Sequence, residues 1–231
     1  VDEFRKRPPR PDARQPLILV EQGELRLDAG YGEARLLGDA RLEDGKLMRL
    51  AARLAPGHLA GPGLISDVSG GRIDLTTAGG RTRFQAQLDL ESLALDDARG
   101  EAIHLEASGD APYPDLKAQK QDGAVVITVR GRADQLEAGE AKGAKVTAAA
   151  SFQGEAEGWL ETLSVVGGGA IRLQAKQAAF ADVTANDVQA SLSAREAHWG
   201  HGHAASDLNL ALSTGAGRKG DLSLSRLRVS A

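Results

Sequence analysis

The chain contains no cysteine and very few large side chains. Only 3% of its 231 residues are aromatic, and there is one methionine. The lack of cysteine excludes a disulfide framework, a thiolate metal site and a cysteine nucleophile. Hydrophobic residues still make up 42% of the chain and charged residues 26%, a composition typical of folded rather than disordered proteins. With so few aromatic rings, any apolar surface must be built from small aliphatic side chains.

Long apolar runs and an excess of positive charge are missing as well. No run of about 18 apolar residues occurs, so the sequence predicts no membrane-spanning helix. The net charge of −4 argues against a nucleic-acid partner, because such proteins carry a concentrated basic face. The chain begins Val-Asp-Glu and ends within a strand-like pattern, LSLSRLRVSA. We therefore expect a segment of a longer protein, with any targeting signal outside it.

What the sequence does have is an internal repeat. Leu93, Leu136, Phe180 and Leu224 stand 43, 44 and 44 residues apart. The first three open similar stretches, LALDDARGEAIHLEA, LEAGEAKGAKVTAAA and FADVTANDVQASLSA. A fixed period of this size predicts a stacked array rather than a closed globule. An array offers a long continuous surface and is poorly suited to a single converging catalytic site.

Most of the chain alternates apolar and polar residues. Residues 1–16 hold four of the eight prolines and are interpreted as a linker or extended edge, and residues 17–231 as one repetitive β-sheet segment. Ala78-Gly79-Gly80 predicts a hairpin turn between two such strands. Residues 47–65 break the alternation, since their first leucines have helical spacing before Pro56. Either a short helix or a strand is compatible with that stretch.

The alternation predicts a mainly all-β fold with little helix. One face of each strand is apolar and the other is polar, as in an antiparallel or solenoidal sheet covered on one side. A closed sandwich would need bulky aromatics at its centre. An elongated repetitive sheet curled into a groove would instead line its hollow with small aliphatics. Such a groove would hold acyl chains, each buried CH₂ contributing about 0.8 kcal/mol.

Motifs for catalysis are absent from the sequence. It has no phosphate-binding loop, no nucleophile elbow and no His-Glu-x-x-His pattern. The glycines at 167–169 precede a strand and are interpreted as a turn or bulge, and the acidic residues at 96–101 as a solvated turn. His58 and His104 are interpreted as isolated surface or rim residues. We therefore expect neither enzymatic activity nor a cofactor.

One histidine cluster is a candidate metal site. His198, His201 and His203 lie within six residues, and two histidines at i, i+2 on a strand point to the same face. Imidazole nitrogens are good ligands for zinc and related metals. The competing interpretation is a polar loop with glycine-enabled curvature and one tryptophan at the rim of the sheet.

The N-terminal pattern resembles a known superfamily. The run at 23–28, GELRLD, and the run at 30–56, GYGEARLLGDARLEDGKLMRLAARLAP, resemble bacterial AsmA/TamB-like proteins, nearest their YdbH-type branch. Later stretches of the form L-x-L-x-x-A-x-G-x-x-Φ-x-L-x-A are similar to the same proteins. The resemblance implies a long periplasmic β-sheet groove that bridges the inner and outer membranes and carries phospholipid. It also implies an inner-membrane anchor, here expected outside the chain, and an outer-membrane or periplasmic partner.

The same resemblance implies no catalytic residues, only a lining for phospholipid acyl chains. The alternation indicates which positions would face inward. These positions are Leu88, Leu90, Leu93, Ile103, Leu105, Ile127, Val146, Ile171, Leu173, Val188, Leu192, Leu208 and Leu210.

Two other functions remain open at the level of sequence. The period could be two rungs of a parallel β-helix, as in the structural or adhesive passenger of an autotransporter. Such helices often show asparagine ladders, whereas this chain has only Asn186 and Asn209. The third interpretation is an enzyme fragment that uses the histidine cluster.

Overall fold

The structure is a computed structural model that describes residues 17–29, 32–114, 119–158, 162–199 and 204–230. These residues form one antiparallel sheet of thirteen strands. The strands are β1 (Ile18–Ala29), β2 (Gly32–Glu43), β3 (Lys46–Leu54), β4 (Gly57–Gly61), β5 (Leu64–Ala78), β6 (Arg81–Leu95), β7 (Ala98–Pro112), β8 (Gly123–Ala138), β9 (Ala141–Glu157), β10 (Ser164–Phe180), β11 (Val183–Trp199), β12 (Ala204–Lys219) and β13 (Leu222–Ser230). The expected linker at 1–16 lies outside the described residues. Within them, no helix is long and apolar enough to cross a membrane.

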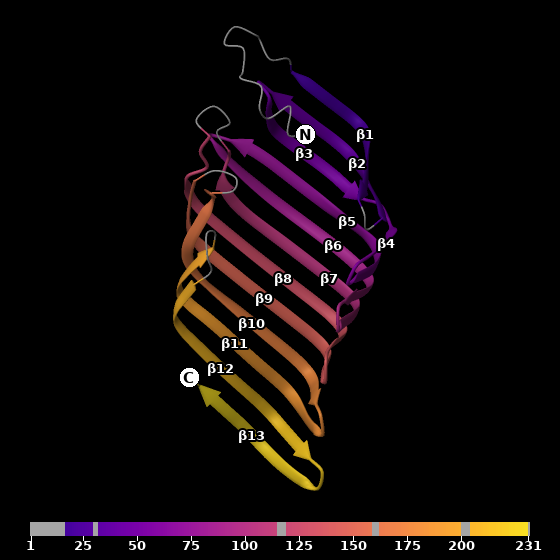
Figure 1. Cartoon of the computed structure of the whole chain (residues 1–231), viewed down its shortest axis with the longest axis vertical. Coiled ribbons are helices and arrows are strands. Elements are labelled where there is room, and N and C mark those ends of the chain that lie inside the picture. The colour runs from indigo at the N-terminus through magenta and orange to yellow at the C-terminus, as the bar shows by residue number, and fades with distance from the viewer. Residues whose placement is uncertain (1–16, 30–31, 115–118, 159–161, 200–203, 231) are drawn as a thin grey trace.

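The strands follow one another through the sheet in chain order. Each pairs with the next along the chain, and only β4 lies off this path, beside β5. The colour in Figure 1 therefore runs steadily along the longest axis, from β1 at one edge to β13 at the other. The expected elongated, repetitive all-β groove is confirmed. The alternative of a parallel β-helix is wrong, because every pairing found here is antiparallel.

The stretch at 47–65 is extended and contains no helix. β3 pairs with the second half of β5 and β4 with its first half, so the two are parts of one strand interrupted at Ala55-Pro56. Proline lacks the N–H that an unbroken ladder would need at this point. The helical spacing of the leucines is overridden by pairing, which sets Leu50 opposite Leu75. The hairpin predicted at 78–80 is confirmed, with Leu75 opposite Phe84 across the turn.

The repeat corresponds to one β-hairpin with a defect at a fixed place. Asp96, Gly139 and Ala181 have left-handed φ values of 50°, 56° and 51° at every second turn, namely β6–β7, β8–β9 and β10–β11. Six residues after each turn, a second left-handed residue interrupts the following strand. These second residues are Ala102, Lys145 and Asp187, with φ of 48°, 50° and 50°. One period therefore consists of a hairpin turn, a strand with an interruption six residues after the turn, and a second strand that leads to the next turn of the same kind.

The interruptions line up across the sheet and form a crease. The register is the same on both sides of the crease, so the residues at the crease lose their ladder pairing without any shift of one strand against the next. The alternation shifts by one residue there, and apolar positions three apart, such as Leu90 and Leu93, lie on the same face. Leu224 departs from the repeat. It lies near the start of β13, whereas Leu93, Leu136 and Phe180 lie near the ends of β6, β8 and β10.

The apolar face is the inner side of the curl. All the buried apolar side chains lie on this face, and they fall between residues 52 and 156. At one corner the curl is tight enough for Tyr113, which follows β7, to accept a hydrogen bond from the backbone N–H of Leu47 in β3 at 3.1 Å. Strands β5 and β6 lie between them in the sheet (Figure 1).

Candidate functional site

The structure brings all thirteen predicted lining positions to one face, which we call the apolar trough (the inner face of β5–β12). Residues directly opposite in adjacent strands share a face, so pairing register assigns each position. The positions fall into rows that cross the sheet. One row contains Leu88, Leu105 and Leu173, and a second contains Leu90, Ile103, Val146 and Val188. A third row contains Ile171, Leu192 and Leu210, a fourth contains Ile127 and Leu208, and Leu93 lies opposite Gly100.

Large and small side chains alternate along these rows. Between Leu105 and Leu173 the intervening strands contribute only Gly131 and Ala148. Glycine and alanine leave furrows between ridges of leucine, isoleucine and valine. The floor is therefore corrugated and apolar, built from the small aliphatics that the shortage of aromatics implies.

The trough is packed at its N-terminal end and open at its C-terminal end. Val68, Leu90, Ile103 and Ala133 form a buried cluster, onto which Leu54, Leu59, Leu88, Leu93 and Leu105 pack. Beyond β9 the same face is uncovered, and Leu173 is 43% exposed and Leu208 55%. Five of the predicted lining positions, Leu88, Leu90, Leu93, Ile103 and Leu105, thus belong to a folded core, and the positions in β10–β12 are unpartnered apolar surface.

A hollow lies where the packed and open parts meet. It has a volume of about 440 Å³ and spans the ends of β6–β11. Its walls include Leu93, Leu136 and Leu173, and its floor includes Gly100 and Gly143. A Cβ at position 143 would approach Val146 to 2.9 Å, so glycine keeps the hollow deep. Small-molecule sites commonly occupy about 300–1,000 Å³ and have mainly apolar walls.

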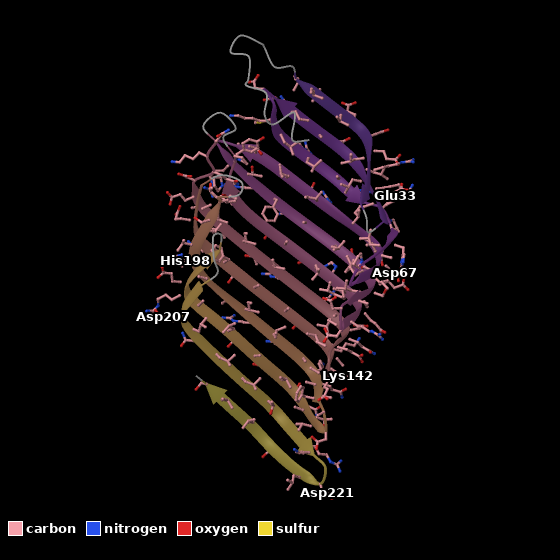
Figure 2. The ribbon with its side chains drawn as sticks, viewed as in Figure 1. Glu33, Asp67, Lys142, His198, Asp207 and Asp221 are labelled. Carbon is pink, nitrogen blue, oxygen red and sulfur yellow. The ribbon has the colours of Figure 1, made fainter. Side chains whose placement is uncertain are left out.

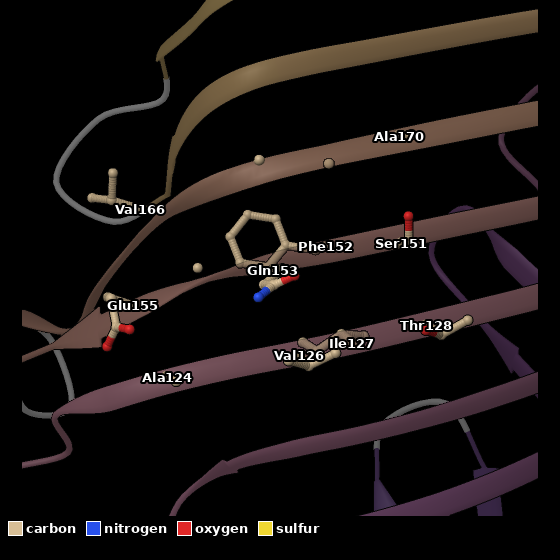
Figure 3. A pocket seen from close by; sticks show the side chains of 13 residues that line it. Ala124, Val126, Ile127, Thr128, Ser151, Phe152, Gln153, Glu155, Val166 and Ala170 are labelled. Carbon is tan, nitrogen blue, oxygen red and sulfur yellow. The ribbon is translucent and has the colours of Figure 1, made fainter.

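A second hollow is larger but has few side chains that could take part in a reaction. It has a volume of about 680 Å³ and lies over the ends of β8–β10 (Figure 3). Thr128, Ser151, Gln153 and Glu155 contribute to its wall. Glu155 is its one ionisable side chain, so this hollow offers no acid–base pair.

The polar face carries paired charges, and two predictions made for it are wrong. His104 and His58 are not isolated. The His104 ring lies between Asp89, at 2.5 Å from Nδ1, and Glu106, at 3.2 Å from Nε2. The hydrogen bond to Asp89, followed by that to Glu106, raises the pKa of His104. His58 bonds Asp67 at 2.7 Å.

Asp67 in turn accepts a hydrogen bond from Ser92 at 2.7 Å. That bond, followed by the one to His58, lowers the pKa of Asp67. Both histidine–aspartate contacts join residues of different strands, Asp89 with His104 and His58 with Asp67. Neither pair was visible as a motif because strand register alone brings the partners together.

The histidine cluster is only partly described. His198 lies in β11 with its Nε2 at 2.9 Å from Glu196, whereas His201 and His203 lie outside the described residues. No group of three potential metal ligands occurs in the part of the chain that the structure describes. The glycines at 167–169 lie in β10 and accompany a shift of register against β11, which confirms the predicted bulge. Asp96 and Asp97 occupy the β6–β7 turn, as expected, whereas Glu101 lies within β7.

The pair of His104 with Asp89 predicts a specific pH dependence of stability. A raised pKa means that the folded state binds the proton more tightly, so this stabilisation is complete below the ordinary value of 6.5 and is lost as pH rises through the folded-state pKa. We expect His104→Gln to lower the thermal midpoint near pH 6, and the difference from wild type to shrink at higher pH. Asp89→Asn, which removes the leading cause, should behave alike. Parallel pH profiles for wild type and both variants would contradict the assignment.

No protein family matches the sequence, and no curated protein or solved structure is significantly similar to it. The geometry of the trough therefore carries the functional argument. Sequence reasoning missed the crease, although the three-residue spacing of Leu90 and Leu93, of Gly100 and Ile103, and of Gly143 and Val146 signals it.

Proposed function

We propose that this chain is a segment of a bridge-like protein that carries phospholipid along the apolar trough without a chemical step. The observation behind the proposal is the continuity of the trough. From β6 to β11 no position on the inner face of the described strands carries a charged side chain. An acyl chain moving from strand to strand would thus meet no desolvated charge.

The dimensions suit an extended path for lipid. Adjacent strands lie about 4.8 Å apart, so the trough, which crosses the strands from β5 to β12, is about 34 Å long. An acyl chain in the trough gains about 0.8 kcal/mol for each CH₂ removed from water. Polar headgroups would remain at the rims, where the labelled polar residues Asp67, Lys142, His198 and Asp207 lie along the two sides of the sheet (Figure 2).

The cellular setting is part of the proposal and rests on the sequence pattern. The resemblance to AsmA/TamB-like proteins, nearest the YdbH-type branch, implies a periplasmic segment between inner and outer membranes. An anchor in the inner membrane and a partner at the outer membrane or in the periplasm would lie outside this chain. The open C-terminal half of the trough supports a conduit, because its apolar side chains are accessible to an acyl chain.

Native mass spectrometry of the purified chain, followed by organic extraction, tests the proposal. We expect phospholipid to copurify, because the exposed apolar face of β10–β12 would otherwise contact water. We also expect delipidated protein to take up a fluorescent phospholipid. A chain that purifies free of lipid and takes up none of the probe would overturn the proposal.

A further inference from the structure

The hollow between β6 and β11 ends close to one rim of the sheet. It extends to Ala98 and Ala141, each of which is the first residue after a hairpin turn. Three of the residues that line the hollow are charged, namely Arg99, Glu137 and Lys142. A phospholipid whose acyl chain occupies the hollow would therefore have its headgroup among the charged residues of these two turns.

The three charged lining residues form a row across three strands. Glu137 in β8 is opposite Arg99 in β7 on one side and Lys142 in β9 on the other. Glu137 bonds Lys142 at 3.0 Å, and the Arg99 side chain has no hydrogen-bond or ion-pair partner within the described part of the chain. Alternation starts these side chains on the polar face, but the turns are only two residues or about 7 Å away, so the long side chains of Arg99 and Lys142 reach the rim. With two bases and one acid, the row carries a net charge of +1 at the mouth of the hollow.

Carboxylates lie farther out, at the tips of the turns. The second residue of the turn is acidic in four hairpins along this rim, at Asp97, Glu140, Asp182 and Asp221. Asp97 and Glu140 directly precede residues that line the hollow, and both are exposed. Neither has a hydrogen-bond or ion-pair partner for its side chain among the residues described, nor does Asp96 in the first of these turns. Moving outward from the hollow, a headgroup would thus meet a cationic row first and free carboxylates second.

We propose that this mouth selects phospholipids whose headgroup ends in a primary ammonium, the class of phosphatidylethanolamine, an inference that rests on the proposed function. The headgroup phosphate is held at Arg99 and Lys142, because charge-assisted hydrogen bonds to phosphate are stronger than neutral ones. The ammonium lies outward of the phosphate and donates its hydrogen bonds to Asp97 or Glu140. A primary ammonium has three such donors.

Other headgroups fit this mouth less well. The two turns with their nearest flanking residues, 96–99 and 137–142, hold four acids and two bases, and this net charge of −2 disfavours an anionic headgroup such as that of phosphatidylglycerol. The quaternary ammonium of choline has no hydrogen to donate to a carboxylate. Choline is recognised by cages of several aromatic rings, whereas the register sets a single ring, that of Phe180, beside Ala141.

Competition among headgroups tests the proposal. The delipidated whole chain is incubated with vesicles of phosphatidylethanolamine, phosphatidylcholine and phosphatidylglycerol, in equal amounts and with identical acyl chains. The protein is then separated from the vesicles, and the lipid extracted from it is quantified by mass spectrometry. We expect phosphatidylethanolamine to exceed each of the others about threefold to fivefold, the range for one exposed charge-assisted contact. Equal occupancy by the three lipids would overturn the headgroup site alone, whereas uptake of none of them would overturn the proposed function as well.

Replacing the free carboxylates with amides tests which residues give the selectivity. Asp97→Asn with Glu140→Gln should abolish the preference for phosphatidylethanolamine without lowering total lipid uptake, because the apolar walls of the hollow are unchanged. Asp44→Asn with Asp221→Asn is the matched control, since it removes two exposed turn carboxylates that lie away from the hollow, and it should keep the wild-type preference. Amide side chains suit turns, and circular dichroism checks that both variants remain folded. A preference that survives the first double substitution, or that is lost equally in both variants, would overturn the proposal.

Discussion

Replacing Leu173 with aspartate is expected to reduce uptake of a fluorescent phospholipid at least about tenfold while leaving the chain folded. Leu173 lines the hollow between β6 and β11, and it lies in a row with Ala148 and Ala190. An acyl chain lying there would strip water from the new carboxylate, and even a loss of 1.4 kcal/mol is tenfold in affinity. Because Leu173 is 43% exposed, the sheet itself depends little on this side chain.

The control for this experiment is the next residue. Gln174 alternates with Leu173, so Gln174→Asp adds the same charge next to the same hollow but with the carboxylate on the polar face of the sheet. Its uptake should equal that of wild type. A Leu173→Asp protein with normal uptake, or equal losses in the two variants, would show that lipid does not pass over β10.

Truncating Leu90 to alanine is expected to destabilise the chain by about 2–4 kcal/mol, the range for removing a buried leucine from a packed cluster. Leu90 is 7% exposed and packs with Val68 and Ile103. These contacts join β5, β6 and β7 on the inner face, so the cavity left behind cannot close without bending the sheet. The midpoint of urea denaturation, followed by circular dichroism, measures the effect.

Leu95 provides the comparison within the same strand. It lies on the same face but beyond the crease, and it is 50% exposed. Leu95→Ala should therefore cost less than about 1 kcal/mol. Similar losses for the two variants would mean that Leu90 is no more part of a packed core than the exposed end of its own strand.

The sequence predicted the two faces of the sheet because alternation is a local property. A side chain at i and one at i+2 share a face in any strand, whatever the strand pairs with. Leu208 and Leu210 could be assigned to one face before any partner strand was known. The same locality explains why residues 47–65 were compatible with either a helix or a strand. Leu47, Leu50 and Leu54 fit a helix as well as an irregular strand, and only pairing with β5 decides between them.

The sequence alone could not predict which side chains make contact between strands. Asp89 and His104 are 15 residues apart and meet because β6 and β7 pair in one register out of many. Arg130 and Arg172 are similar, since two successive pairings bring them within two strands of each other. A shift of one residue in either pairing would move one member of each set to the other face.

By itself the sequence determined an all-β array, its hairpin period and the thirteen apolar positions of one face, since these depend on local alternation and turn chemistry. Only the tertiary structure decided that the inner face is a packed core around Leu90 and an open surface around Leu173. The reason is that burial depends on how far the sheet curls. Curl is the sum of small twists and interruptions over many strands, and it brings together residues from strands far apart in the chain.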